Sequence, residues 1–373
     1  MHTLNFMPIG NGDCCRIDLA NGQKLLFDYA DLRNASDKND RRIDLAAILR
    51  ANLDKAKRDY YDVVAFTHLH DDHIHDASEF FHLRHAAKYQ GGGRIKINTL
   101  WLPAAVIVED QCEDEAKIIQ DEARHRFRIG EGIRVFSRPD KLRDWLKKQG
   151  IALEDRKHLI TDAGQTIPEF SLTEHEVEFF VHSPLATRLN DGGLVDRNDD
   201  SLFLQATFLA DGQYTKLLLT ADVTHEILTA IVDVTRFHKR DARLEWDVVN
   251  VPHHTSYKSL GPEKGKDKTE PVENVKWLYE EKGNAGGILV STSWVIPTAD
   301  TDQPPHRQAA NYYKKVARDK GGEYVVTMEH PKEARPEPLV IVIDGNKAKV
   351  VKGSYSGVAI ITGGQAPRAG GGR

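Results

Sequence analysis

Short apolar runs alternate with amphipathic segments along most of the chain, a pattern typical of α/β proteins. The runs that predict strands lie at residues 3–8, 14–19, 24–28, 62–67, 97–103, 177–182, 201–209, 215–221, 246–252, 287–292, 323–328 and 338–343. The segments that predict helices lie at residues 42–58, 108–128, 139–149, 223–238, 272–282 and 304–319. Because strands and then helices recur in each half, we expect an αββα sandwich, with two mixed β-sheets face to face and helices outside.

The same pattern predicts how the chain is divided. Residues 1–352 are expected to form one domain that carries a helix-rich insert at about 77–170. The Gly-rich segment 353–373 is expected to be a flexible tail, with contact to a protein partner as the alternative. The helix at 108–128 is mixed in charge, so its acidic residues are expected on a solvated face. These are Glu113, Asp114, Glu115 and Glu122.

Composition narrows the class of protein. The 373 residues include 51 Lys and Arg against 56 Asp and Glu, a net charge of −5, which argues against a broad basic surface for duplex DNA but allows a local cationic groove. No apolar run approaches 18 residues and the first residues do not resemble a signal peptide, so we expect a cytoplasmic protein that does not enter a membrane. With 17 His and only 3 Cys, a metal centre would be built from imidazole and carboxylate.

One stretch carries most of the chemical information. His68, His70, Asp72 and His73 form an H-x-H-x-D-H pattern directly after the apolar strand 62–67, where α/β proteins place ligands. In a loop that reverses after a strand, the first two imidazoles converge on one point and Asp72 and His73 turn towards a second. This arrangement suits two metal ions about 3.5–4 Å apart, either Zn²⁺, Mn²⁺ or Fe. The alternative interpretation is a polar helix N-terminus that binds no metal.

Two other strand ends supply further candidates. Asp222 follows an apolar strand and is expected to bridge the ions, with a helix N-cap as its alternative role. The strand 246–252 ends in His253-His254, of which we favour His253 as the metal ligand. His254 is then expected to orient a ligand or to contact substrate.

These residues resemble the metallo-β-lactamase fold superfamily, and within it the hydrolase domain of the competence protein ComEC and its stand-alone relatives. The likeness spans roughly residues 4–345. The motifs that carry it are Asp28 at a strand end, the H-x-H-x-D-H loop, Gly10-Asn11-Gly12-Asp13, Asn198-Asp199-Asp200-Ser201, Asp222, Pro252-His253-His254-Thr255-Ser256, and His306 after Pro305. The resemblance implies two divalent metal ions, Zn or Mn, with Asp28 anchoring the metal loop and Ser256 close to the ligands or the substrate.

The chain departs from that pattern at two places. The superfamily usually supplies a third histidine to the first metal, whereas Asn198 stands at that position here, as in the ComEC-like branch. His182 is a competing candidate, and its alternative is a strand histidine hydrogen-bonded to a neighbour. Thr255 stands where the branch prefers glycine.

The expected activity is hydrolysis by a metal-bridged hydroxide, with Asp72 or Asp222 accepting a proton. His306, which opens a helix, is expected to bind an anion or act as a general acid, or else to be a surface histidine.

The resemblance favours a phosphodiesterase or nuclease acting on nucleic acid or a nucleotide. A lysine-rich segment, with Lys258, Lys264, Lys266 and Lys268, could follow a phosphate backbone or be a solvated loop. The alternatives are a hydrolase of small esters, thioesters or lactones, and a non-catalytic module that binds a partner.

Overall fold

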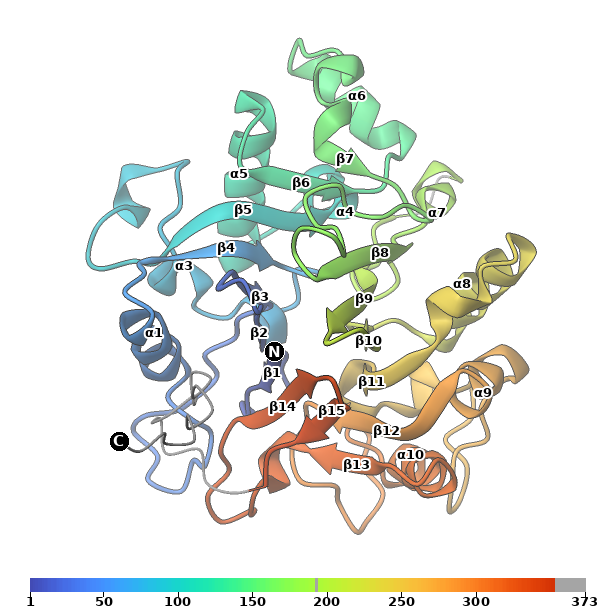
Figure 1. Ribbon diagram of the computed structural model, residues 1–373. Helices are drawn as coiled ribbons and strands as arrows, with labels where there is room; N and C mark the ends of the chain where they lie inside the picture. Colours follow the sequence, from blue (N-terminus) through green and yellow to red (C-terminus); the bar gives the residue numbers. More distant parts are fainter. Residues whose placement is uncertain (192–193, 353–373) are drawn as a thin grey trace, which may run out of the picture.

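Two mixed β-sheets form the centre of the protein in the computed structural model, which describes residues 1–191 and 194–352 (Figure 1). Within these residues the larger sheet has nine strands, in the order β15 (Lys347–Val350), β14 (Leu339–Asp344), β1 (His2–Phe6), β2 (Cys15–Asp18), β3 (Lys24–Phe27), β4 (Tyr60–Ala65), β5 (Lys96–Pro103), β6 (Ile133–Phe136) and β7 (Ile160–Thr161). The smaller sheet has six, in the order β13 (Glu323–Val326), β12 (Gly283–Ser291), β11 (Trp246–Asn250), β10 (Gln213–Leu219), β9 (Phe203–Ala210) and β8 (Val177–Ser183).

Each sheet has an antiparallel part and a parallel part. The pairings between successive strands from β3 to β7 are parallel, and so are the pairings from β10 to β13. The remaining pairings are antiparallel. Because the carboxyl ends of parallel strands meet at one edge of a sheet, the loops that follow β3, β4, β10 and β11 are brought together.

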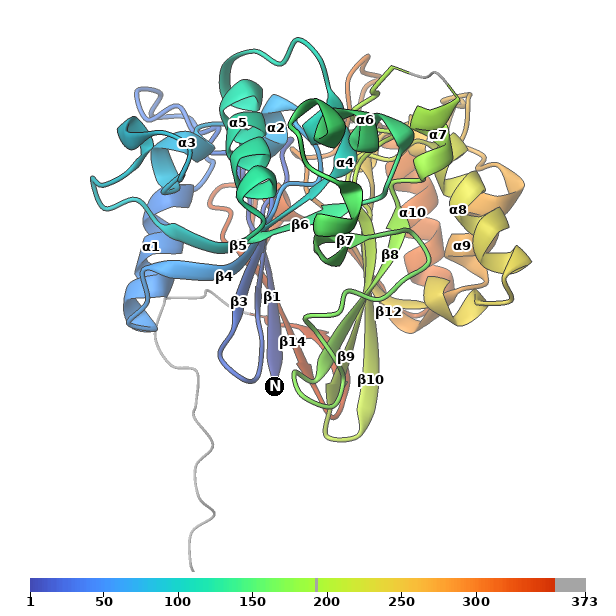
Figure 2. The same ribbon diagram turned by 90° about the horizontal axis from the view of Figure 1, so that it is seen from above.

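Helices cover the outer face of each sheet, so the layers run helix, sheet, sheet, helix (Figure 2). The larger sheet is covered by α1 (Leu45–Lys55), α2 (Asp71–Ile74), α3 (Ala77–Phe80), α4 (Ala104–Val108), α5 (Asp114–Ile129) and α6 (Asp140–Lys148). The smaller sheet is covered by α8 (His225–Phe237), α9 (Glu273–Glu280) and α10 (Arg307–Asp319). The short helix α7 (Ala186–Asn190) precedes β9. This confirms the prediction of two mixed sheets with helices outside.

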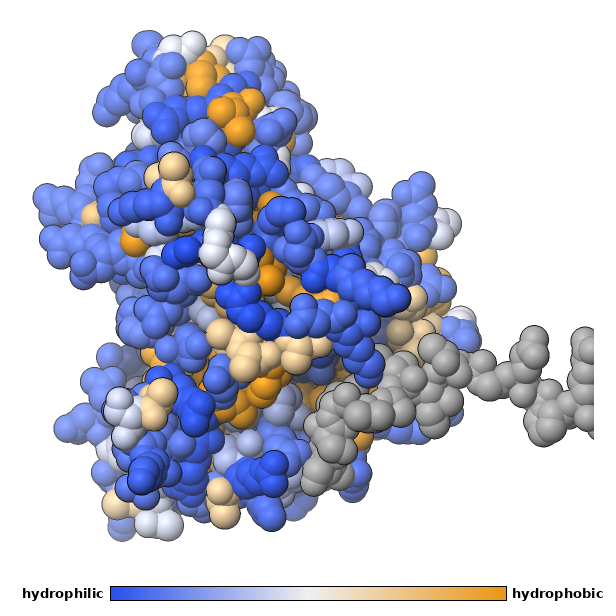
Figure 3. Space-filling model, turned by 90° about the vertical axis from the view of Figure 1, so that its left-hand side faces the viewer, coloured by the Kyte–Doolittle hydropathy of each residue, from blue (hydrophilic) through white to orange (hydrophobic). Residues whose placement is uncertain are grey.

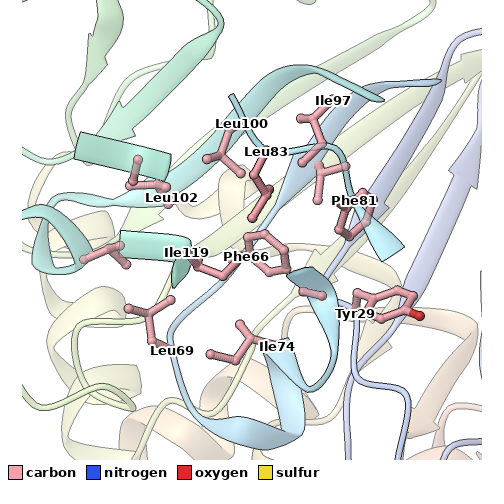
Figure 4. Packing of buried hydrophobic residues seen from close by; sticks show 14 of the residues in the cluster. Tyr29, Phe66, Leu69, Ile74, Phe81, Leu83, Ile97, Leu100, Leu102 and Ile119 are labelled. Carbon is pink, nitrogen blue, oxygen red and sulfur yellow. The ribbon is translucent and has the colours of Figure 1, made fainter. Parts of the chain in front are cut away.

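Three apolar layers hold the arrangement together. Between the sheets, Trp101 on β5 meets Phe27 on β3 and Phe179 on β8 edge to face. Between the larger sheet and its helices, Phe66 is surrounded by aliphatic side chains and by Phe81 (Figure 4). The third layer lies between the smaller sheet and α8, α9 and α10. Burial of apolar surface at about 25 cal/mol per Å² makes these layers the main source of stability.

The segment 77–170 is helix-rich as predicted, but it is not merely an insert. It contributes β5, β6 and β7 to the larger sheet, so it extends the sheet as well as covering it. Of these strands, only β5 was predicted. β6 has four residues and β7 has two, which is too short for a pattern of alternating polarity to show. The predicted tail at 353–373 lies outside the described residues.

One acidic residue of α5 corrects the prediction of a solvated face. Glu122 is fully buried, and its carboxylate accepts hydrogen bonds from Arg126 Nε at 2.6 Å and from the backbone N–H of His85 at 2.9 Å. Arg126 is also buried and donates to the carbonyls of Ile97 and Gly132. The pair therefore joins α5 to the larger sheet. Although burial opposes the shift, the hydrogen bond to the His85 ring and the charge of Arg126 lower the pKa of Glu122 to about 2.

Hydrophilic side chains cover most of the face that carries α1, with apolar side chains gathered between its upper and lower halves (Figure 3). Among the described residues, no helix combines the length and the apolar character needed to pass through a bilayer.

Candidate metal centre

Loops from both sheets meet at one edge of the sandwich and bring acidic and histidine side chains together. Asp13 lies between β1 and β2, Asp28 follows β3, and the 68–73 loop follows β4. From the smaller sheet, Asp222 follows β10 and the 253–255 turn follows β11. Backbone hydrogen bonds join neighbouring loops. They run from Asp13 N to Asp72 O at 3.1 Å, from Tyr29 N to His73 O at 3.0 Å, and from His253 N to Ala221 O at 3.1 Å.

Four of these side chains form a tight cluster. Ligand atoms of Asp72, His73, Asp222 and His254 all lie within 4.8 Å of one another. His73 Nε2 is 3.4 Å from Asp222 Oδ1, and His254 Nε2 is 3.6 Å from Asp222 Oδ2. Two ligands on one tetrahedral ion, each about 2.0–2.1 Å from it, stand about 3.3 Å apart, so this spacing suits a shared cation. The prediction that Asp72, His73 and Asp222 converge is confirmed.

Asp28 orients the histidines of the loop. Its Oδ2 accepts a hydrogen bond from His73 Nδ1 at 2.9 Å and another from Thr67 Oγ1 at 2.7 Å. Thr67 Oγ1 in turn lies 3.2 Å from His68 Nδ1. A carboxylate that accepts from Nδ1 leaves Nε2 as the free lone pair, so His73 presents Nε2 to Asp222. Asp28 anchors the loop, as predicted, and burial raises its pKa to about 6.

The structure brings His254, and not the favoured His253, into the cluster, while metal ligation by either histidine remains a prediction. His254 Nε2 lies within the cluster, 3.0 Å from Asp72 Oδ2, while its Nδ1 is 2.8 Å from the carbonyl oxygen of Thr292. His253 Nε2 is 3.9 Å from Asp222 Oδ2. His253, His254 and Thr255 all have positive φ, at 51°, 50° and 66°. This left-handed turn sets which ring faces the carboxylates, and a residue pattern does not reveal it.

Thr255 has a left-handed conformation, in which glycine would be accommodated without strain. A β-branched residue at positive φ is strained by about 1–3 kcal/mol. Here the Thr255 hydroxyl bonds to Ser291 Oγ at 2.6 Å and to Tyr324 OH at 3.0 Å. These two hydrogen bonds compensate for the strain and hold the turn next to the cluster.

The remaining predicted ligands of the first metal lie beside the cluster. His68 Nε2 is 3.0 Å from His70 Nδ1, and the ring centroids of His68 and His73 are 4.0 Å apart. Arg197 Nη1 donates to the carbonyl of Leu69 at 2.7 Å, which ties the segment containing Asn198 to the same loop. Asn198 Oδ1 is buried without a hydrogen-bond partner. Ligation of a metal by His68, His70 or Asn198 remains a prediction.

The polar atoms of the centre fit a cation. His73 Nε2, Asp222 Oδ1 and His253 Nδ1 are buried and lack hydrogen-bond partners. Buried polar atoms in proteins are almost always paired, and nitrogen and carboxylate oxygen together are the ligands that Zn²⁺ and Mn²⁺ accept. The described residues can therefore hold a metal ion. The cluster is open on one side, because the side chain of Asp72 is 34% exposed and that of His253 is 21% exposed.

Charge supports the same conclusion. Burial lowers the pKa of His68 well below its usual range, so its imidazole is neutral and able to bind metal. His254 has its pKa raised to about 9, although burial opposes this, chiefly by the charge of Asp222 and the hydrogen bond to Asp72. The carboxylates thus favour positive charge at this place, and a divalent cation satisfies the same preference.

Two further residues of the predicted site make contacts outside the cluster. His182 corrects the prediction of a third histidine ligand, because Nε2 bonds to the Arg243 carbonyl at 2.8 Å and the ring packs on Phe180 and Phe203. His306 caps α10, and its ring nitrogens lie near Tyr257 N and Asp302 O at 3.3 and 3.4 Å. His306 is buried, so it is not the surface histidine of the alternative, and its role as anion ligand or general acid remains a prediction.

Ser256 and the lysine-rich segment also have local roles. Ser256 Oγ accepts from the backbone of Lys258 at 3.3 Å and caps a short turn. The lysine-rich segment is held to α10 by a hydrogen bond from Thr269 N to Gln308 O at 3.1 Å. Lys264 donates to the Thr301 carbonyl and Lys268 pairs with Glu270, so the segment is not a free cationic arm.

Sequence reasoning missed the part that Asp13 plays. Its carboxylate is buried, accepts from Asn250 Nδ2 at 3.3 Å, and groups with Asp28 and His73 within 4.8 Å. Its position in the Gly-x-Gly-Asp turn was the available signal.

The chain matches no protein-family model, and no curated protein matches it significantly.

Replacing Asp28 by asparagine is expected to weaken metal binding by about 10- to 100-fold. The new amide NH₂ would take the place of Oδ2 and face His73 and Thr67, which both donate to that oxygen in the wild type. His73 Nδ1 would then have to accept a hydrogen bond, so its proton would move to Nε2, the atom that faces Asp222. Competition with a chromogenic chelator measures the affinity. Asp71→Asn is the control, since Asp71 is in the same loop but its side chain is 70% exposed and pairs with His75. Equal affinities in both variants would contradict the role given to Asp28.

Proposed function

We propose that this protein is a metal-dependent hydrolase of the metallo-β-lactamase superfamily that holds two divalent cations. The observation that carries the proposal is the meeting of Asp72 and His73 from one sheet with Asp222 and His254 from the other. The support for the family is the order of these residues along the chain and the pair of mixed sheets with helices outside. The residues that would hold the first ion are His68, His70 and Asn198, with Asp222 shared between the two ions.

Each residue of the centre has its own role in the proposed hydrolysis. Divalent cations, when bound, lower the pKa of coordinated water to about 7 and stabilise charge on the attacked group. Asp222 is buried between His73 and His254 and therefore positions both imidazoles. Asp72 is the carboxylate of the cluster with solvent access, so it is placed to accept a proton from water that enters. Asp28 and the Thr292 carbonyl keep the Nε2 atoms of the two histidines directed at the carboxylates.

We favour a phosphodiester as substrate, on the strength of the resemblance to the ComEC-like branch. A second candidate, hydrolysis of small esters, thioesters or lactones, is favoured by one feature. Next to the metal loop lies a cavity of about 370 Å³, lined by Asp71, Glu113, Asp114 and Glu115 with Arg197 as its single basic residue. An acidic wall repels a long phosphate backbone, so a nucleic acid would have to approach the centre from another side.

Hydrolysis of bis-p-nitrophenyl phosphate and of p-nitrophenyl acetate, with Mn²⁺ and Zn²⁺ supplied in turn, tests the proposal. We expect turnover of the phosphodiester, reduced at least about 100-fold in Asp72→Ala and retained in Asp71→Ala. These residues are neighbours, but only Asp72 belongs to the cluster. Turnover of the acetate alone would favour the second candidate. Bound metal with neither activity would favour a partner-binding module.

A further inference from the structure

A second cavity, of about 730 Å³, is lined by residues of both β7 and β8, the end strands of the two sheets. Its wall is formed by β6, β7, the turn at 164–168, β8 and the residues around η4 (Asp241–Leu244). Thr166 in the turn forms an isolated β-bridge with Phe180 on β8, which joins the turn to the smaller sheet. None of the residues that line this cavity belongs to the metal centre.

Strand register places the cavity to one side of the metal centre on both sheets. Arg134 on β6 lies opposite Trp101 on β5, which lies opposite Ala65 at the end of β4. Phe180 on β8 lies opposite Gln205 on β9, which lies opposite Leu218 on β10. The cavity is thus two strands away from β4 and from β10, the strands that lead to the metal loop and to Asp222. Neighbouring strands stand about 4.8 Å apart, so it is a separate site.

The charged side chains that line the cavity are all basic. They are Arg134, Lys157, Arg240 and Arg243, joined by His158, and no acidic residue among the described ones lines it. Four basic side chains around one cavity are costly unless negative charge compensates them. This is unexpected in a chain whose net charge is −5.

Contacts outside the cavity fix two of the guanidinium groups. Arg134 forms an ion pair with Glu169 and donates to the carbonyl of His158 at 2.9 Å, and its buried Nε has no hydrogen-bond partner. Arg243 forms an ion pair with Glu178, and its guanidinium lies 4.8 Å from the centre of the Phe180 ring. Glu169 and Glu178 do not line the cavity. They therefore hold the two arginines in place from outside it.

The other two cations are less compensated. Lys157 Nζ lies 3.7 Å from Glu154, a pair in which both side chains are more than half exposed. Arg240 Nη1 donates to the Gly164 carbonyl at 2.7 Å, a neutral partner. An exposed ion pair contributes little, so Lys157 and Arg240 leave positive charge along the lining of the cavity.

We propose that this cavity binds a small molecule bearing a phosphate or diphosphate group. Guanidinium groups fixed from one side keep donors free for planar, bidentate contacts, which match phosphate oxygens. A phosphate or diphosphate group carries two or three negative charges and can pair with several of these side chains at once. A single carboxylate cannot. The volume lies within the range of small-ligand pockets, about 300–1,000 Å³, and favours a ligand of nucleotide size.

Isothermal titration of the full-length protein with inorganic pyrophosphate and with AMP tests this site. The titrations are done in the presence of EDTA, so that metal bound at the other centre does not contribute, and are repeated with the metal-loaded protein. We expect saturable binding of both compounds, weakened at least about tenfold by the double variant Lys157→Ala/Arg240→Ala. Both positions are exposed, so their replacement leaves the core unchanged.

The control is Lys276→Ala/Arg318→Ala, which removes the same charge from exposed positions of α9 and α10. This control is expected to bind like the wild type. Equal weakening in both double variants would show a general charge effect and overturn the assignment. So would the absence of saturable binding in EDTA, or binding of a single-stranded oligonucleotide without binding of pyrophosphate or AMP. Because no step depends on turnover, an inactive metal centre would leave this result unaffected.

Discussion

Replacement of Asp222 by alanine is expected to abolish metal binding at micromolar concentrations and to reduce any metal-dependent hydrolysis about 1,000-fold. Asp222 lies close to three histidines of the centre. Its two oxygens lie 3.4 Å from His73 Nε2, 3.6 Å from His254 Nε2 and 3.9 Å from His253 Nε2. Alanine leaves three imidazoles without the carboxylate between them, so no pair of histidines from the two sheets is held at ligand spacing. Metal analysis after dialysis and a turnover assay measure the two effects.

A matched variant separates this effect from general damage. Asp233→Ala removes a carboxylate from an exposed position of α8, where Asp233 accepts a hydrogen bond from Asn274 at 2.7 Å. It should retain metal and activity. Circular dichroism of both variants should match the wild type, because Asp222 contacts side chains of the centre and not the apolar layers. A folded Asp222→Ala variant that keeps its full metal content would overturn the proposed centre.

Replacement of Glu122 by glutamine is expected to lower the free energy of unfolding by about 3–5 kcal/mol. The neutral amide leaves the buried guanidinium of Arg126 without its charge partner and turns an NH₂ group towards a donor. Wild-type stability should also fall as pH drops from about 4.5 to about 2. The pKa of Glu122 is held to about 2 in the folded protein, so unfolding takes up a proton across this interval.

Urea unfolding followed by fluorescence measures the change at neutral pH. Glu113→Gln is the control, because Glu113 precedes the same helix, is exposed, and makes no capping hydrogen bond with its side chain. It should change the unfolding free energy by less than about 0.5 kcal/mol. A loss below about 1 kcal/mol in Glu122→Gln would mean that the buried pair contributes little.

Much of the centre was predictable because its residues directly follow apolar strands. The H-x-H-x-D-H loop and Asp222 each come at the end of such a strand, and parallel strands deliver their ends to one edge. The choice between His253 and His254 was not predictable. It depends on three consecutive left-handed residues, and no spacing rule for side chains applies to such a turn.

The elements of the fold also differ in how well the sequence predicts them. Long strands such as β5 and β9 were predicted because eight residues give a clear pattern. The short strands β6 and β7 gave none, although they complete one wall of the basic cavity. Glu122 was placed on the solvated face because helix α5 is rich in charge. Its burial depends on the ion pair with Arg126, and Arg126 in turn donates to the carbonyl of Ile97 on β5, which lies far from the helix in the chain.

The origin of the cluster in two sheets has a mechanical consequence. Asp72 and His73 belong to one layer, and Asp222 and His254 to the other, so a cation bound among them cross-links the layers. Its binding free energy then adds to the cohesion of the whole sandwich and grows with free metal concentration. Without the ion, this edge of the sandwich would keep only the direct contacts between the layers, such as that between His254 and Asp72.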